Sequence, residues 1–263
     1  MIPKIIHYCW FGKNPKTKLA MKCIKSWREK CKDYTIIEWN EENFDISKCP
    51  LYVRQAYELK KWAFVTDYVR LLVVYENGGI YFDTDVQVIK SFDNLLLCNS
   101  FFGFENAEYV ATGLGFGAEK GAQIIKELLE QYIDILFVQP DGTIDDLPCP
   151  QRNTEVFVKN GLILNNKLQY LFNGTVVYPS EYFCPLKWNG KMKLTKNSMS
   201  IHWFAESWHD HAEDRLKKKQ RKKQKYHEKI DIIKHLPNNI AMKLLGESTY
   251  ERIKKTKAIK HTR

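Results

Sequence analysis

Residues 63–86 read AFVTDYVRLLVVYENGGIYFDTDV and contain the strongest structural signal in the chain. Apolar residues at helical spacing, stopped by the glycine pair at 78–79, predict the end of a helix that spans residues 51–76. A short apolar strand follows and ends in two carboxylates, Asp83 and Asp85. Because ligands bind at the carboxyl ends of strands in an open α/β sheet, this junction predicts a site.

The segments on either side complete an α/β pattern. A strand, a helix and a second strand are predicted at residues 5–9, 17–31 and 34–39, which is the usual opening of such a sheet. Further on, the sequence predicts a β pattern at 86–89, strands at 101–104 and 113–117, and helices at 120–137 and 156–164. No repeat or low-complexity linker interrupts residues 1–211, so we expect one domain there.

The two carboxylates are the first candidates for chemistry. Asp83 and Asp85 follow a buried strand at i and i+2, so we expect them in a turn or bulge, where their oxygens suit Mg²⁺ or Mn²⁺. Such an ion in turn bridges a diphosphate. Taken alone, the pair fits a solvated β-turn equally well. Asp67 and Arg70 share a face of the preceding helix, so we expect them near the same cleft rather than in an ordinary exposed ion pair.

Length and composition fit an enzyme-sized globular chain. Its 263 residues are 44% hydrophobic and 27% charged, which is enough to bury a core without disulfides or a structural metal. No apolar run approaches the roughly 18–20 residues of a spanning helix, and the N-terminus lacks a signal-peptide pattern. The seven cysteines are odd in number and form no C-x-x-C pair. These features predict a reducing, cytoplasmic setting.

The formal net charge of +10 comes from the C-terminal end. Residues 212–263 hold 17 Lys and Arg against 6 Asp and Glu, whereas the preceding residues are nearly neutral. The run KKKQRKKQK at 217–225 predicts an exposed, basic helical tail. It fits a solvated charged helix or a peripheral attachment to anionic lipid, with apolar anchors from IIKHLPNNIAMKLLG. Nucleic-acid binding is disfavoured, because the run has few aromatic residues and no recognition module.

The same landmarks resemble a known family. Residues 63–86 look like the core signature of the DXD-containing sugar transferases of glycosyltransferase family 32, which includes bacterial capsule enzymes and a fungal initiating mannosyltransferase. They are more distantly similar to the catalytic domains of clostridial glucosylating toxins. The resemblance extends to IPKIIHYCWFG at the N-terminus, to ATGLGFGAEKG at 111–121 and to HWFAESW at 202–208. It implies a GT-A-like, Rossmann-like mixed sheet flanked by helices, a nucleotide-sugar donor, Mn²⁺ or Mg²⁺, and a retaining transfer.

The resemblance also assigns roles to single residues. The candidate catalytic residues are Asp83, Asp85 and Arg70, of which Asp83 would contact ribose or sugar hydroxyls and Arg70 the donor sugar and phosphate. Donor contacts are implied for six side chains: Trp10, which would stack on the base, and Asp67, Arg70, Tyr81, Asp83 and Trp208. For Trp10, a core position at a strand end is the competing interpretation.

The metal ligands implied by the resemblance are Asp85 and His202. Neutral imidazole is acceptable to Mn²⁺, but a satisfied core histidine fits the same position equally well. Ser207 or Glu206 could supply an oxygen instead.

The expected chemistry is cleavage of the anomeric bond to a diphosphate, which builds positive charge on the sugar and negative charge on the leaving group. The metal and Arg70 would stabilise the leaving group. The sequence does not choose between a group on the back face of the sugar and a same-face attack by the acceptor. Four loop residues could reach the site, although each also fits an ordinary loop or acceptor contact: Glu105, Asn106, Gln151 and Asn153.

Two other classes compete with sugar transfer. A haloacid-dehalogenase-like phosphohydrolase also uses a strand followed by D-x-D, but Gln87 stands where that family has Thr or Val. A non-enzymatic membrane- or nucleic-acid-binding module leaves the acidic cleft unexplained. We therefore expect a GT-A-like catalytic domain at 1–211 and a basic tail at 212–263.

The expected function is metal-dependent, retaining transfer of a hexose from a UDP- or GDP-sugar to a glycan or lipid-linked saccharide acceptor, in surface polysaccharide synthesis. We expect the enzyme in the cytoplasm, attached peripherally to the inner face of the membrane through its tail.

Overall fold

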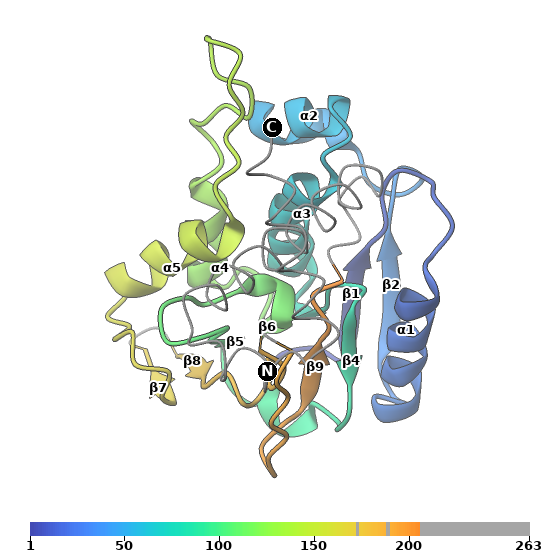
Figure 1. Ribbon diagram of the computed structural model, residues 1–263, viewed down its shortest axis with the longest axis vertical. Coiled ribbons are helices and arrows are strands. Elements are labelled where there is room, and N and C mark those ends of the chain that lie inside the picture. Colours follow the sequence, from blue (N-terminus) through green and yellow to red (C-terminus); the bar gives the residue numbers. More distant parts are fainter. Residues whose placement is uncertain (172–173, 188–189, 206–263) are drawn as a thin grey trace, which may run out of the picture. The chain divides into compact units, whose positions relative to one another are not determined.

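The structure is a computed structural model of the chain, and it describes residues 1–171, 174–187 and 190–205. All of them belong to one compact unit, Met1–Trp208. A mixed sheet runs through this unit and carries helices on both faces (Figure 1). The predicted α/β architecture, a mixed sheet flanked by helices, is therefore confirmed. The tail predicted at 212–263 lies outside the described residues.

Helices and strands alternate through the first half of the unit. The α-helices are α1 (Lys18–Lys30), α2 (Leu51–Glu58), α3 (Trp62–Asn77), α4 (Gln123–Glu130) and α5 (Cys149–Lys159). The strands are β1 (Ile5–Cys9), β2 (Thr35–Trp39), β3 (Gly79–Tyr81), β4 (Val86–Val88), β5 (Ser100–Gly103), β6 (Phe116–Ala118), β7 (Gln169–Tyr170), β8 (Thr175–Tyr178) and β9 (Ser200–His202).

The larger sheet has seven strands in the order β2-β1-β3-β6-β5-β8-β7. β1 pairs parallel with both β2 and β3, whereas β6 runs antiparallel between β3 and β5. The carboxyl ends of β1, β2 and β3 therefore meet at one edge of this sheet. β4 pairs with β9 in a separate antiparallel ribbon, in which Val86 lies opposite His202.

Side chains of the central strands fill a core on each face of the sheet. Ile80 and the following Phe82 join the core that includes α1, whereas Tyr81 joins the core that includes α2, α3, α4 and α5. Phe101 and Phe102 of β5 divide in the same way. Since successive side chains of a strand project to opposite faces, a strand covered on both faces is apolar throughout. This explains the uninterrupted apolar runs that the sequence shows at both strands.

The glycine pair forms the junction between α3 and β3. Gly78 and Gly79 have φ of +68° and +112°, and a Cβ on Gly79 would come within 2.7 Å of the Ile5 carbonyl oxygen. His7 Nε2 lies 2.8 Å from the Gly78 carbonyl oxygen, and Trp39 Nε1 donates to His7 Nδ1 at 3.1 Å. Burial lowers the pKa of His7, so the ring is neutral with its proton on Nε2. It ties the junction to β1.

The prediction of one helix at 51–76 is wrong in one respect, because two helices, α2 and α3, occupy this range. The break falls at residues 59–61, where Lys60 has a φ of +56°. It lets Tyr57 and Trp62 pack edge to face with ring centroids 5.3 Å apart, and a Cβ on Gly12 would lie 2.7 Å from the Trp62 ring. Apolar spacing continues across the break, so periodicity does not show it.

Other boundaries shift as well. α4 is shorter than the helix predicted at 120–137, and α5 begins before residue 156, since proline near its first turn favours a helix start. The strand predicted at 113–117 is a 3₁₀ turn, Thr112–Leu114, followed by β6. The sequence did not predict β7, β8 or β9.

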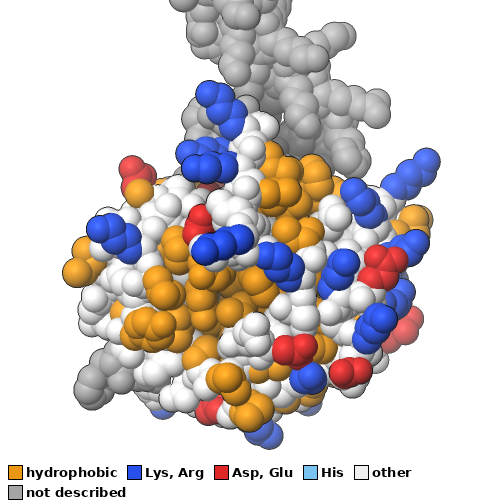
Figure 2. Space-filling model, turned by 90° about the horizontal axis from the view of Figure 1, so that it is seen from below, with side chains coloured by type: hydrophobic (Ala, Val, Ile, Leu, Met, Phe, Trp, Pro, Cys, Tyr) orange, Lys and Arg blue, Asp and Glu red, His pale blue; other side chains and the backbone are white. Residues whose placement is uncertain are grey.

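Hydrophobic side chains gather on the face of the molecule seen from below, with Lys and Arg around them (Figure 2). Met1, Leu97 and Leu194 are among the exposed large apolar residues, at 79%, 76% and 53% exposure. Among the helices that the structure describes, none combines the length and apolar character needed to cross a membrane.

Candidate active site

The centre of the site is the turn that joins β3 to β4. The Val86 N–H donates to the Asp83 carbonyl oxygen at 3.0 Å, which closes a tight turn over residues 83–86. Asp83 and Asp85 are therefore in the turn that the sequence predicts. Because β4 pairs with β9, the turn also lies beside His202, whose Nε2 is 3.3 Å from Asp85 Oδ1. The Ala205 N–H donates to Asp85 Oδ2 at 2.8 Å.

Asp83, Asp85 and His202 form a group that suits a metal ion. One ligand atom from each residue lies within 4.8 Å of the others, and their side chains are 25%, 15% and 14% exposed. The buried His202 Nδ1 has no hydrogen-bond partner among the described residues. Two carboxylates and an imidazole are a donor set that Mn²⁺ accepts. The residues present therefore fit a divalent cation, and an unpaired imidazole nitrogen is uncommon in a purely structural histidine.

Arg70 holds Asp83 from the other side. Its Nη2 lies 3.1 Å from Asp67 Oδ1 and 3.2 Å from Asp83 Oδ1, and its guanidinium lies 5.3 Å from the centre of the Tyr81 ring. The Tyr81 hydroxyl donates to Asp83 Oδ1 at 3.1 Å. The structure thus brings the i, i+3 pair of α3 to the carboxylates of the turn. Only 5% of the Arg70 side chain is exposed, so its positive charge is buried between the carboxylates of Asp67 and Asp83.

Three further residues, Thr112, Gly113 and Asn153, lie beside Arg70 and Asp83. Thr112 and Gly113 were not predicted as site residues from the sequence, and Asn153 was predicted to lie in a loop. Arg70 Nη1 donates to Thr112 Oγ1 at 3.4 Å, and Asn153 Nδ2 donates to the same oxygen at 3.0 Å. Gly113 lies so close that a Cβ there would be 2.5 Å from Asp83 Oδ2. The signal for these contacts is only the small-residue run ATGLG, because Thr112 and Asn153 reach the site through tertiary packing.

The charges of the cluster are incompletely balanced. Burial raises the pKa of Asp83 to about 6; Arg70 opposes this rise and Asp85 adds to it. Burial also acts on Asp85, but His202 and the Ala205 N–H outweigh it and lower the pKa of that carboxyl. Burial opposes the charged form of His202, yet Asp85 raises its pKa. Closely spaced carboxylates of this kind favour a bound cation.

Trp10 lies at the carboxyl end of β1, the strand beside β3. Its backbone N–H continues the pairing of β1 with β2 by donating to the Trp39 carbonyl oxygen at 2.9 Å. Its Nε1 donates to the Asn14 carbonyl oxygen at 2.6 Å. Lys16 Nζ sits 5.8 Å from the centre of the ring and pairs with Glu38 at 2.8 Å. Trp10 is half-buried at the same edge of the sheet as the acidic turn, and Lys16 lies over one face of its ring.

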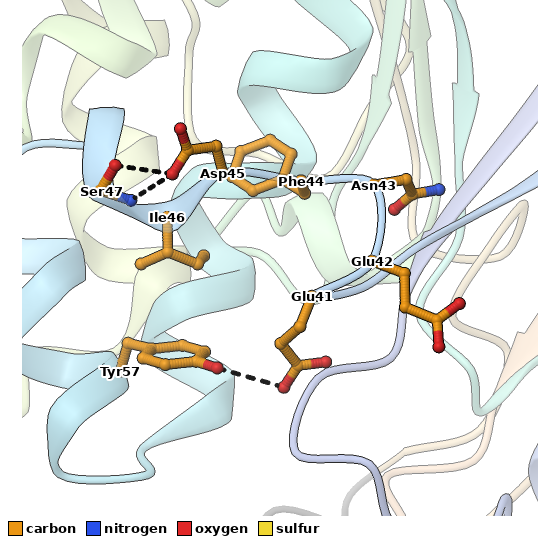
Figure 3. A pocket seen from close by; sticks show the side chains of 8 residues that line it. All are labelled: Glu41, Glu42, Asn43, Phe44, Asp45, Ile46, Ser47 and Tyr57. Atoms are coloured by element: carbon orange, nitrogen blue, oxygen red, sulfur yellow. Dashed lines mark hydrogen bonds between the residues drawn. The ribbon is translucent and has the colours of Figure 1, made fainter.

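A cavity of about 480 Å³ opens next to this edge, where the chain leaves β2 (Figure 3). Glu41 and Tyr57 face each other across it, with the Tyr57 hydroxyl donating to Glu41 Oε1 at 3.4 Å. The same carboxylate accepts the Gly12 N–H at 2.7 Å, which ties the cavity to the turn that follows Trp10. Phe44 and Ile46 supply its apolar lining.

The four loop candidates separate in the structure. Asn153 is buried at the site, and Glu105 is half-buried, with a pKa that burial raises and the charge of His202 lowers in part. Asn106 instead organises its own loop, since its side-chain oxygen accepts the N–H of Glu108. Gln151 lines a second cavity on α5. Trp208, Glu206 and Ser207 lie outside the described residues.

The site thus has the features that the resemblance to the DXD sugar transferases implies: an α/β sheet, a D-x-D turn after β3 and a buried arginine beside it. Residues 17–102 match the model of a family described as glycosyltransferase sugar-binding region containing DXD motif. Residues 17–102 therefore carry a glycosyltransferase sugar-binding region, in agreement with the resemblance to the DXD transferases. The match favours sugar transfer over the phosphohydrolase and the non-enzymatic module.

Two curated relatives carry the name lactosylceramide 4-alpha-galactosyltransferase. The Mus musculus protein is 27% identical over 140 residues, which make up 53% of this chain and 37% of the relative. The Rattus norvegicus protein is 27% identical over 129 residues, 49% of this chain and 34% of the relative. The match thus spans little more than a third of the relatives' length.

Similar solved structures include the PaToxG glycosyltransferase, with a TM-score of 0.46 and 20% identity over 60% of this chain and 68% of that one. Another is a glycosyltransferase involved in glycosylation of the major capsid of PBCV-1, with a TM-score of 0.45 and 15% identity over 77% of this chain and 95% of that one.

Proposed function

We propose that the chain transfers a hexose from a UDP- or GDP-sugar, with retention of anomeric configuration and with Mn²⁺ or Mg²⁺, to a glycan or lipid-linked saccharide. The observation that carries this proposal is the cluster of Asp83, Asp85 and His202 at the carboxyl edge of the sheet. Asp85 and His202 would hold the cation. Asp83, fixed by Arg70 and Tyr81, would meet donor hydroxyls from the neighbouring position.

The reaction builds positive charge on the sugar and negative charge on the leaving diphosphate, and the site residues would stabilise both charges. A divalent cation in the cluster would supply positive charge to the diphosphate as it leaves. Arg70 pairs with both Asp67 and Asp83, and its single positive charge reduces the repulsion between these carboxylates and an anionic donor. Thr112 and Asn153 fix the guanidinium, so the arrangement needs little reorganisation during the reaction.

The donor base would stack on Trp10, at the end of the strand next to the acidic turn. The names of the curated relatives support a hexose donor and a saccharide on a lipid as acceptor, since both are galactosyltransferases acting on lactosylceramide. We propose a related acceptor class in surface polysaccharide synthesis. The assay below identifies the donor base and the sugar.

Donor hydrolysis tests this function directly. Purified full-length protein is incubated with a panel of UDP- and GDP-sugars, with Mn²⁺ or with chelator, and free nucleotide and sugar are quantified. Turnover of one donor that requires the cation and falls at least 100-fold in Asp85→Asn supports the proposal. Asp141→Asn, in an exposed loop, is the matched control. Cation-independent turnover, or equal activity of Asp85→Asn, contradicts it.

Retention has its own readout. When an acceptor is supplied, proton NMR of the first product shows the anomeric configuration, and inversion would exclude the retaining mechanism while leaving sugar transfer intact.

We also propose that the enzyme works in the cytoplasm, attached peripherally to the inner face of the membrane. The basic sequence at 217–225 supports an attachment through the tail, because cations near anionic lipid contribute about 1 kcal/mol each. Figure 2 shows a further surface that would suit a membrane, where apolar side chains lie beside Lys and Arg. Unchanged binding to phosphatidylglycerol vesicles after removal of residues 213–263 would exclude the tail as the anchor.

A further inference from the structure

A second cavity, of about 460 Å³, lies between α5 and the loop that follows β5. Tyr109 and Glu108 line it from the loop, and Gln151, Glu155 and Val158 line it from α5. Its volume falls in the range of small-molecule sites, about 300–1,000 Å³. The donor residues described above are not part of it, so the cavity requires its own explanation.

The loop is a short hairpin with a regular register. Phe104 pairs with Val110, and the Glu105 N–H donates to the Tyr109 carbonyl oxygen at 2.8 Å. Phe104 and Val110 are buried, whereas Glu105 and Tyr109 are half-buried. Since side chains alternate along each arm and opposed residues share a face, Glu105 and Tyr109 project to the same face of the hairpin.

This face connects the cavity to the acidic cluster. Tyr109 lines the cavity, and its neighbour across the hairpin is Glu105, whose pKa is raised by burial and lowered in part by the charge of His202. The wall of the cavity is also continuous with the donor wall. Thr154 Oγ1 accepts the Val110 N–H at 2.9 Å, and the preceding residue of α5, Asn153, donates to Thr112 beside Arg70.

The lining has the chemistry that a sugar requires. Tyr109 and Val158 offer apolar surface for the C–H face of a pyranose. Glu108, Gln151, Glu155 and Lys159 have side chains without a hydrogen-bond or ion-pair partner in the part of the chain that the structure describes. They supply both donors and acceptors for hydroxyl groups. Two carboxylates against one ammonium disfavour a phosphate or an acidic sugar.

We propose that this cavity is a subsite for the acceptor, and that it holds a neutral saccharide unit next to the ring that receives the transferred hexose. The acceptor would lie across the face of the hairpin, with its reactive hydroxyl near Glu105 and the acidic cluster and its distal ring against Tyr109. This inference rests on the proposed function and deepens it. It makes α5 and the hairpin determinants of acceptor specificity, separate from the residues that hold the donor.

The test separates acceptor binding from donor chemistry. Full-length wild type, Tyr109→Ala and the double variant Gln151→Ala/Glu155→Ala are compared with Lys126→Ala/Glu130→Ala, an exposed charged pair on α4. Each protein is applied, fluorescently labelled, to an array of neutral and acidic oligosaccharides, and its donor hydrolysis is measured without acceptor. Transfer kinetics follow with the oligosaccharide that wild type binds best.

We expect wild type to prefer neutral oligosaccharides and both cavity variants to bind them at least tenfold more weakly. Their acceptor KM should rise by a similar factor, with donor hydrolysis unchanged within about twofold and the α4 control like wild type. Equal binding and equal acceptor KM in the cavity variants would overturn the subsite while leaving the proposed function intact. A wild type that binds no neutral oligosaccharide, or prefers acidic ones, would also overturn it. Absence of donor hydrolysis in wild type would instead refute the proposed function.

Discussion

Gly113 offers the sharpest test of how tightly the acidic turn is held. A Cβ at this position would lie 2.5 Å from Asp83 Oδ2 and 3.4 Å from Arg70 Nη1. Ordinary contact begins at about 3.4 Å, so Gly113→Ala must move the carboxylate by about 0.9 Å, the difference between 3.4 and 2.5 Å. The displacement would strain the site, because Arg70 and Tyr81 both bond the other oxygen of the same carboxylate.

A misplacement of about 1 Å in a catalytic constellation costs about 100-fold in rate, or roughly 2.7 kcal/mol. We therefore expect the kcat/KM of donor hydrolysis to fall about 100-fold in Gly113→Ala, while the far-UV spectrum and the thermal midpoint stay close to those of wild type. Gly121→Asn is the matched control. A Cβ there meets nothing within 4 Å, and Asn tolerates its φ of +74°. Activity of Gly113→Ala within threefold of wild type would refute the tight contact, and equal loss in both variants would refute its specificity.

Three further perturbations test the structure around the site. Arg70→Met leaves Asp67 and Asp83 without their buried counterion, so the free energy of unfolding measured in urea should fall by about 3–5 kcal/mol; a loss below 1 kcal/mol would contradict the buried pairing. Lys60→Gly relieves a left-handed backbone conformation and should raise that free energy by about 0.5–1 kcal/mol, whereas a decrease would place the break elsewhere. Burial works against the charged form of Glu38, but Lys16 and Tyr8 lower its pKa below the usual 4.5; stability from this carboxylate is present above pH 4.5 and lost as the pH falls through the folded value. The difference between wild type and Glu38→Gln should therefore shrink in acid, and a difference independent of pH would count against the pairing.

The site residues that are close together in the sequence could be predicted from it, whereas those far apart in the sequence could not. Asp67 and Arg70 are one helical turn apart, and Asp83 and Asp85 follow the next strand, so spacing alone placed all four near one cleft. His202 came only from the resemblance, since no local pattern links β9 to β4. Tertiary packing decides such contacts, and a single sequence does not show it.

The same limit explains the errors in the fold. The opening strand, helix and strand were predicted, because strong periodicity and turn residues mark them. The break at Lys60 was missed, since a lysine in a left-handed conformation leaves no compositional trace. Two of the three strands that the sequence missed, β7 and β9, have only two and three residues, too short for alternation to be detected. Asn153 was taken for a loop residue because the start of α5 was placed too late.

The pairing of β4 with β9 also means that a cation bound by Asp83, Asp85 and His202 would affect the stability of the fold. Asp85 and His202 are 117 positions apart in the sequence, yet they lie side by side. A cation bound by both residues would cross-link the two ends of a long segment that contains β5, β6, α4 and α5. Cross-links that close loops of about 100 residues restrict the unfolded chain by roughly 4–5 kcal/mol in the chain-entropy model. Chelation would then do more than stop turnover: it would leave the β4–β9 ribbon to close this loop and would lower the resistance of the segment between Asp85 and His202 to proteases.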